Sequence, residues 1–264
     1  MNRDLFCGRR AIVTGASSGI GREIALELAQ RQVTQILLAR NAERLDEVVQ
    51  SANKLGGHAT ALAGDIADEL VRNQAIDRAV TTLGGLDLLI NNAGVGRIGP
   101  FEHSDVHQLR RLIEVNLVAP LELTRAALPI LRQGNRPLVV NIGSVLGHFS
   151  VTNKSEYCAT KFALRGFSDA LRAEVRSQGI DVLYVAPSTT RTEFFARSQP
   201  GSPTGPLHRW NSMSSAKVAH CIVRAIERGQ SDVVLSLGGR GLVWLHRLFP
   251  RWTRSVIEWA TRSA

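Results

Sequence analysis

Short apolar runs alternate along the chain with longer stretches in which apolar residues recur at helical spacing. The apolar runs predict seven strands, at 10–14, 35–39, 58–63, 86–91, 137–142, 180–186 and 233–237. The helical spacing predicts six helices, at 19–31, 42–55, 68–83, 104–132, 155–177 and 215–228. Strands alternating with helices indicate β-α-β units, and near-continuously apolar strands indicate a parallel sheet covered on both faces. We therefore expect one large α/β domain.

Two segments fall outside this alternation. Residues 188–214 show no period and contain Pro200, Pro203 and Pro206, so we expect a long loop that acts as a substrate lid; the alternative is a disordered segment. The stretch 239–264 carries apolar residues at helical spacing, with arginines opposite them and Pro250 in the middle. This basic amphipathic extension is typical of a helix at a membrane surface, but also of one packing on its own domain or a second subunit. We expect the main domain to span 1–238.

Composition narrows the class of protein. Of 264 residues, 44% are hydrophobic and 21% charged, which excludes a mainly disordered chain. Three widely spaced cysteines favour a reducing compartment such as the cytoplasm over a disulfide framework or a metal site. No signal peptide and no run of about 20 apolar residues is visible, so we expect a soluble protein, at most attached to a membrane surface. The formal net charge of +9 comes mostly from scattered arginines, and with 5% aromatic residues this argues against nucleic-acid binding.

A glycine-rich segment, 14–21, follows the first predicted strand and opens the first helix. Its glycines, Gly15, Gly19 and Gly21, would allow a sharp turn and a close approach of the backbone to a pyrophosphate. The helix N-terminus would present unpaired N–H groups to the phosphates. The strand-loop-helix context predicts a dinucleotide site, although the spacing differs from Gly-x-Gly-x-x-Gly.

The end of the second strand bears on the choice of cofactor. An acidic residue there would bind the 2′-hydroxyl of NAD, whereas an arginine accommodates the 2′-phosphate of NADP. This chain has Ala39 and Arg40 and no acid. We therefore predict a preference for NADP(H) over NAD(H); the alternative is a surface arginine at a strand end.

Tyr157 and Lys161 form the sharpest short motif. Residues four apart lie on one face of a helix, so both side chains can reach one site. A free tyrosine has a pKa of about 10, and a nearby ammonium and an oxidised nicotinamide would lower it. Such a tyrosine can exchange a proton with a carbonyl oxygen. The alternative is a half-buried tyrosine beside a solvated lysine.

Two further polar residues support the catalytic interpretation. Ser144 follows an apolar strand, where open α/β sheets bind their ligands, and could contact the substrate oxygen. Asn116 lies among apolar residues on the inner face of a long helix, where its amide needs partners and could hold a water that relays protons to Lys161. The alternatives are a turn cap for Ser144 and a satisfied core amide for Asn116.

These ordered motifs resemble the short-chain dehydrogenase/reductase family over residues 8–237. The resemblance implies a doubly wound, Rossmann-type sheet of seven parallel strands and a catalytic tetrad of Asn116, Ser144, Tyr157 and Lys161. Tyr157 would be the proton donor and acceptor, and Lys161 would hold the nicotinamide ribose and lower the pKa of the tyrosine. Ser144 would position the substrate and Asn116 would support the proton relay. The family also implies a homodimer or homotetramer.

The same resemblance assigns the cofactor contacts. Asp65 and Ile66 would contact the adenine, Asn92 to Gly94 would lie near the cofactor's ribose, and Thr192 would contact the carboxamide or phosphates. Two departures stand out: Pro187-Ser188 replaces the usual Pro-Gly, and Gly143 replaces a common serine. The full set of expected cofactor contacts is Gly15, Ser17, Ser18, Gly19, Ile20, Gly21, Arg40, Asp65, Ile66, Asn92, Ala93, Gly94, Tyr157, Lys161, Pro187, Ser188, Thr190 and Thr192.

The sequence thus predicts an NADP(H)-dependent oxidoreductase that transfers a hydride between nicotinamide and a carbonyl or alcohol substrate. Apolar residues of 145–151, of the turn after Gly94 and of the lid favour a hydrophobic substrate. We expect no metal. A non-catalytic NADP-binding regulatory module is the alternative, although a module of that kind would need only the phosphate loop.

Overall fold

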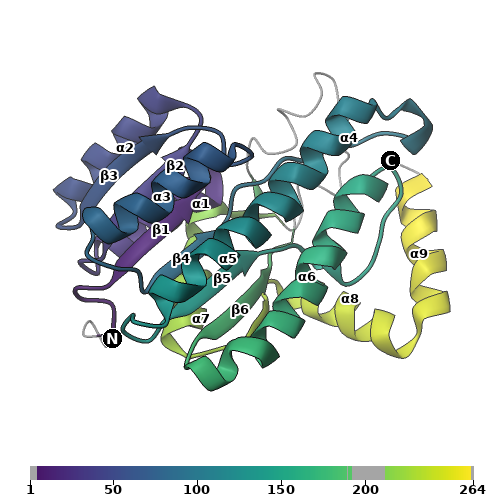
Figure 1. Ribbon diagram of the computed structural model, residues 1–264. Helices are drawn as coiled ribbons and strands as arrows, with labels where there is room; N and C mark the ends of the chain where they lie inside the picture. The colour runs from purple at the N-terminus through teal and green to yellow at the C-terminus, as the bar shows by residue number, and fades with distance from the viewer. Residues whose placement is uncertain (1–4, 189, 192–211, 263–264) are drawn as a thin grey trace.

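The computed structural model describes residues 5–188, 190–191 and 212–262. At its centre lies a parallel sheet with the strand order β3-β2-β1-β4-β5-β6-β9. The strands are β1 (Arg10–Thr14), β2 (Thr34–Ala39), β3 (His58–Ala63), β4 (Leu88–Asn91), β5 (Leu138–Ile142), β6 (Asp181–Ala186) and β9 (Asp232–Val234). The predicted seven-stranded parallel sheet is confirmed (Figure 1).

Helices cover both faces of the sheet, which explains why its strands are apolar throughout. One face packs against α1 (Gly19–Ala29), α2 (Ala42–Lys54) and α7 (Ser215–Glu227). The other packs against α3 (Glu69–Thr81), α5 (Ala119–Leu131) and α6 (Ser155–Val175). The doubly wound architecture is therefore confirmed (Figure 1). The strand order reverses between β1 and β4, so the crevice at their carboxyl ends is the expected ligand site.

Two element predictions were wrong in their boundaries. The single helix predicted at 104–132 is divided into α4 (Val106–Ile113), a π-helical turn (Glu114–Val118) and α5. The strand predicted at 233–237 ends at Val234, because the Ser236 hydroxyl accepts a hydrogen bond from the N–H of Gly239 and so caps a new helix. That helix is α8 (Leu237–Leu248), so the extension begins two residues before the predicted boundary.

The C-terminal extension forms two helices, α8 and α9 (Pro250–Arg262), joined at Phe249. The break at Pro250 is as predicted, and the two helices lie at one side of the domain (Figure 1). Val243 of α8 and Thr253 of α9 are buried. Leu245, Leu248, Trp252 and Val256 are exposed. The two helices therefore pack on the chain's own domain through Leu242, Val243 and Ile257, while the described residues of the predicted apolar stripe stay exposed. Trp259, the last residue of that stripe, lies outside the described side chains. No helix within the described ranges is long and apolar enough to cross a membrane.

Most of the predicted lid, 188–214, lies outside the described residues, which include only its two ends. At those ends β7 (Thr190–Arg191) pairs with β8 (Met213–Ser214) in parallel. The two-residue pairing brings the start and the end of the segment together beside α7.

Candidate active site

The glycine-rich loop connects β1 to α1 at the carboxyl edge of the sheet. Gly15 has a φ of +66°, and a Cβ on it would lie 2.9 Å from the Cα of Ala93. A Cβ on Gly21 would lie 2.4 Å from both the Asn92 side chain and the Gly15 carbonyl oxygen. Gly15 and Gly21 are thus required by close packing within the protein itself.

The N-terminus of α1 differs from that of its neighbours. Its N-cap residue, Ser18, makes no side-chain capping hydrogen bond, and the first turn contains no acidic residue. In contrast, the N-caps of α2, α3, α4, α7 and α8 all accept a hydrogen bond from a backbone N–H. The loop of Ser17, Ser18, Gly19 and Ile20 therefore leaves backbone donors available, which is the arrangement that binds a phosphate. The site fits the dinucleotide predicted from the sequence.

Asn92 braces this loop. Its side chain donates to the carbonyl oxygens of Thr14 at 2.9 Å and Gly15 at 3.2 Å. The Thr14 hydroxyl in turn accepts from the N–H groups of Asn92 and Ala93, both at 3.0 Å. Asn92 to Gly94 are only partly buried and lie beside the crevice. The structure shows that the Asn92 amide holds the phosphate loop in place.

Arg40 and Asp65 lie at the far end of the crevice, after β2 and β3. Asp65 accepts a hydrogen bond from the N–H of Ala67 at 3.0 Å and forms an ion pair with Arg111 of α4. Burial tends to raise the pKa of Asp65, but these two hydrogen bonds and the charges of Arg111 and Arg40 lower it overall. Arg40 is exposed, while Ile66 is buried in the adjoining core. Arg111 was not predicted, because its pairing with Asp65 spans 46 residues.

Ser144 follows β5 and is held by a second tyrosine. Its hydroxyl accepts from the N–H of Leu146 at 3.1 Å, and Tyr184 donates to its carbonyl oxygen at 3.3 Å. A Cβ on Gly143 would lie 2.2 Å from the Tyr184 ring, and one on Gly147 would lie 2.4 Å from its hydroxyl. The departure at Gly143 therefore makes room for Tyr184. Two glycines flanking Ser144 are the sequence signal that could have indicated this bulky neighbour.

Tyr157 and Lys161 lie together on the first turns of α6, both buried. The Lys161 ammonium is 5.6 Å from the centre of the Tyr157 ring and donates to the carbonyl oxygen of Ile142 at 3.0 Å. Burial lowers the pKa of Lys161 to about 8. Burial also raises the pKa of Tyr157 above its ordinary value, and a hydrogen bond with the Ser144 side chain opposes this rise only in part. In the protein alone the pKa of Tyr157 is thus raised rather than lowered, because loss of hydration outweighs the hydrogen bond with Ser144. The lowering expected beside an oxidised nicotinamide stays a prediction.

Asn116 lies in the π-helical turn between α4 and α5. Its amide accepts from the N–H of Val95 and donates to the carbonyl oxygen of the same residue, both at 2.8 Å. A further bond reaches the Thr160 hydroxyl at 3.4 Å. Both N–H groups are therefore in use, and a relay water could use only the remaining lone pair of the side-chain oxygen. Such π turns are frequent at functional sites.

A buried ion pair ties the segment after Gly94 to the start of α6. Arg97 donates to Glu156 at 2.9 Å, and their side chains are 4% and 1% exposed. The Ser104 hydroxyl donates to the same carboxylate oxygen at 2.5 Å. Arg97 is therefore an internal brace. Because Glu156 precedes Tyr157, this brace fixes the turn that carries the phenol.

The residues predicted to line an apolar pocket differ in their burial. Val145 and Phe149 are buried in a cluster with Tyr184 and Val243 of α8. Val95, Ile98 and Leu146 remain partly exposed near the tetrad. The other expected lining residues, Phe194, Phe195, Leu207 and Trp210, lie outside the described residues.

The segment after β6 carries the last of the residues predicted to contact the cofactor. The carbonyl oxygen of Pro187 accepts from the N–H of Val145 at 3.0 Å, and Thr190 donates to the carbonyl oxygen of Ser188 at 3.1 Å. Thr192 lies outside the described residues. Within the described ranges, no group of three or more His, Cys, Asp or Glu residues is arranged to hold a metal ion.

A family model described as short chain dehydrogenase matches residues 9–202. The chain belongs to the short-chain dehydrogenase/reductase family. It is 33% identical to "Dehydrogenase/reductase SDR family member 7B" of Bos taurus over 235 residues. The matched region covers 85% of this chain and 72% of that protein. The chain is thus an oxidoreductase of the CH–OH and C=O groups with a nucleotide-binding fold.

Solved structures of the family have the same architecture. A short-chain dehydrogenase from Sphingobium yanoikuyae in complex with NADPH is 30% identical, with a TM-score of 0.79, covering 87% of this chain and 88% of that one. A short-chain dehydrogenase/reductase from Burkholderia phymatum in complex with NAD is 23% identical, with a TM-score of 0.84, covering 92% of this chain and 94% of that one. At that lower identity the second similarity supports the fold alone.

Proposed function

We propose that this protein is an NADP(H)-dependent oxidoreductase in which Tyr157 exchanges a proton with a carbonyl or alcohol substrate. The observation that carries the proposal is the convergence of Ser144, Tyr157 and Lys161 at the carboxyl end of β5. When bound, the nicotinamide would supply or accept the hydride. Gly15, Ser17 to Gly21 and the uncapped start of α1 would hold its phosphates.

Each side chain of the site would have its own role in the proton transfer. Burial keeps Tyr157 protonated, so its hydroxyl is ready to donate to a substrate oxygen as that oxygen gains negative charge. Lys161 is charged below about pH 8 and would stabilise the phenolate that results. Ser144 would orient the substrate oxygen toward Tyr157. Asn116 would fix the segment at Val95 that borders the site, with one lone pair left for a water.

The preference for NADP(H) rests on Arg40. This exposed guanidinium follows β2 in the position where an acidic residue would select NAD, and its charge acts on Asp65. The related structure solved with NADPH supports the same choice. Replacing Arg40 with Ala should weaken NADPH binding about tenfold or more in a fluorescence titration and leave NADH unchanged. Equal effects on both cofactors would contradict the preference.

Substrate class and assembly are extensions of this proposal. The partly exposed Val95, Ile98 and Leu146 favour a hydrophobic carbonyl or alcohol. Val106 and Ile113 on α4 and Phe162 on α6 expose apolar surface, which supports a homodimer or homotetramer through these helices. Sedimentation of an Ile113→Ser/Phe162→Ser variant should then give a smaller particle. The free cysteines fit a reducing compartment, and we propose the cytoplasm.

A panel of carbonyls and alcohols, followed by NADPH absorbance, tests the chemistry. The Tyr157→Phe variant should keep its NADPH affinity and lose turnover by about 100-fold or more. An unaffected variant would remove Tyr157 from the mechanism. Absence of turnover on every class, with tight NADPH binding, would favour the regulatory module instead.

A further inference from the structure

The two C-terminal helices present an unusual amount of apolar surface. Half of the large hydrophobic side chains exposed in the described part of the chain lie on α8, α9 and the joint between them. They include Trp244 at 64% exposed, Leu248 at 61%, Phe249 at 58% and Trp252 at 59%. Single exposed hydrophobic residues are ordinary, but a contiguous group marks a surface that binds something.

The geometry of α8 explains why this surface faces outward. Val243 is buried against Val145 and Tyr184, and an α-helix turns about 100° per residue. Leu237, Trp244 and Leu248 therefore share a stripe about a third of a turn around the helix from Val243, and all three are exposed. On α9 the buried residue is Thr253, which leaves Trp252 and Val256 exposed. We call the exposed residues of Leu237–Val256 the apolar face.

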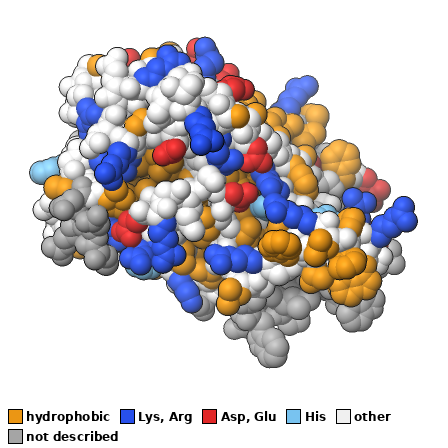
Figure 2. Space-filling view, turned by 90° about the horizontal axis from the view of Figure 1, so that it is seen from below, with side chains coloured by type: hydrophobic (Ala, Val, Ile, Leu, Met, Phe, Trp, Pro, Cys, Tyr) orange, Lys and Arg blue, Asp and Glu red, His pale blue; other side chains and the backbone are white. Residues whose placement is uncertain are grey.

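Arginines border the apolar face. Arg240, Arg247, Arg251 and Arg254 are all exposed, and none of them forms an ion pair with another described residue. The only acidic residue in the two helices is Glu258. In Figure 2 hydrophobic and basic side chains gather on the side where α8 and α9 lie in Figure 1. An apolar stripe flanked by arginine and tryptophan matches a membrane–water boundary with anionic headgroups.

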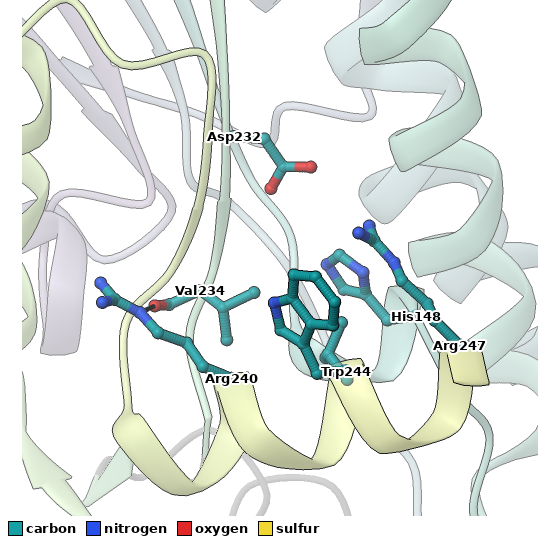
Figure 3. A pocket seen from close by; sticks show the side chains of 7 residues that line it. His148, Asp232, Val234, Arg240, Trp244 and Arg247 are labelled. Carbon is teal, nitrogen blue, oxygen red and sulfur yellow. Dashed lines mark hydrogen bonds between the residues drawn. The ribbon is translucent and has the colours of Figure 1, made fainter. Parts of the chain in front are cut away.

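A cavity of about 300 Å³ opens along the arginine flank (Figure 3). Arg240, Trp244 and Arg247 of α8 line one side, and His148 and Asp232 line the other. Asp232 is offset by Arg165 at 3.6 Å, which leaves the guanidinium groups of Arg240 and Arg247 as the excess charge. His148 is 8% exposed; its Nδ1 faces Arg165 at 2.6 Å, and its buried Nε2 has no partner among the described residues. With Nδ1 accepting, Nε2 carries a hydrogen that is free to bond an anion.

Charge decides between the two occupants that an apolar face of this kind could have. In a symmetric contact between two copies, each apolar face meets its own equivalent, so two sets of four arginines without acidic partners among the described residues would be brought close together. An anionic lipid surface instead supplies both apolar depth and opposite charge.

We propose that the apolar face docks onto the surface of an anionic phospholipid membrane. Trp244, Leu248 and Trp252 enter the interface, and a lipid phosphate binds the cavity between Arg240, Arg247 and His148. This docking goes beyond the proposed oxidoreductase function and does not depend on it.

Flotation of the full-length protein with vesicles tests the proposal. We expect binding to vesicles of phosphatidylcholine mixed with phosphatidylserine, and at least about tenfold less binding to phosphatidylcholine alone. A Trp244→Ser/Trp252→Ser variant should lose at least about tenfold in binding, and Arg247→Gln about fivefold. The matched controls are Leu70→Ser, which changes an exposed hydrophobic residue of α3, and Arg110→Gln, which changes an exposed arginine of α4; both should bind as the unaltered protein does.

Two outcomes would overturn the docking. Equal losses for the control and tail variants would show that the apolar face has no special role. Absent vesicle binding, with a smaller sedimenting particle for Trp244→Ser/Trp252→Ser, would assign the face to a second copy of the chain. NADPH turnover, measured without vesicles, should be the same in every variant, so failure of docking is separable from failure of the enzyme.

Discussion

The carboxyl ends of β4 and β5 and the helix pair α8–α9 differ in how far their side chains are paired within the chain. At the sheet edge, most buried polar side chains find a partner: Asn91 donates to Thr124 and Asn141, and Asn141 donates to Ser168, all at 2.9–3.0 Å, although Asn91 Oδ1 itself accepts nothing from the described residues. On α8–α9, Trp244 and Trp252 are exposed, and the described arginines have no acidic partner among the described residues. A site that must hold atoms in fixed positions is largely completed within the chain. A surface left incomplete is one that a partner completes.

Breaking the Arg97–Glu156 pair should have the largest effect. In Glu156→Gln the buried Arg97 loses its counter-charge, so we expect the free energy of unfolding to fall by about 3–5 kcal/mol in urea denaturation. Glu102→Gln removes a carboxylate that is 79% exposed and should change stability by less than about 0.5 kcal/mol. A Glu156→Gln protein as stable as the unaltered one would show that the sheet edge tolerates unpaired charge.

The contact between Gly143 and Tyr184 should come next. Gly143→Ala places a methyl group 2.2 Å from the tyrosine ring, and we expect a loss of about 1–3 kcal/mol by urea denaturation. The loss should largely disappear when the same change is made in a Tyr184→Val background. Gly166→Ala on α6, where a Cβ meets nothing within 4 Å, is the matched control and should be neutral or stabilising. If Gly143→Ala lowered the free energy of unfolding equally in both backgrounds, contact with Tyr184 would not be the cause of the loss.

The charge of Lys161 should set the alkaline limb of activity. Its pKa in the protein is about 8, below the ordinary lysine value, so the ammonium is present at lower pH and is lost as pH rises through 8. The kcat/KM for NADPH, which reports the enzyme before cofactor binds, should fall about tenfold per pH unit above that point. In Lys161→Arg the fall should move to higher pH. An unmoved limb would assign it to another group.

Substitutions on the apolar face should affect stability least. Trp252→Ser removes a side chain that is 59% exposed, so we expect a change within about 0.5 kcal/mol in thermal or urea denaturation. Val243→Ala changes the buried residue directly before Trp244 and should cost about 1–2 kcal/mol. A strongly destabilised Trp252→Ser protein would mean that the chain itself covers this surface.

Sequence reasoning worked where the determining pattern is local. The glycine loop, the four-residue spacing of Tyr157 and Lys161, and Ser144 at the end of an apolar strand all lie within single segments. It failed where segments distant in sequence meet: Arg97 with Glu156, Arg111 with Asp65, and Tyr184 with Gly143. The raised pKa of Tyr157 in the protein alone was missed for the same reason, because burial depends on the whole fold. Periodicity likewise predicted the tail helices, but it could not tell which side their neighbours would cover.

The π-helical turn at Glu114–Val118 has a consequence for how this protein can change over generations. A turn of this kind holds one residue more than an α-helix needs, so losing a residue there would restore a regular helix and rotate α4 by about 100° relative to α5. Leu112 would swing out of the core, and Asn116 would leave Val95. Point substitutions can accumulate along this helix, whereas a one-codon deletion within the turn would separate the active-site amide from the segment that it supports.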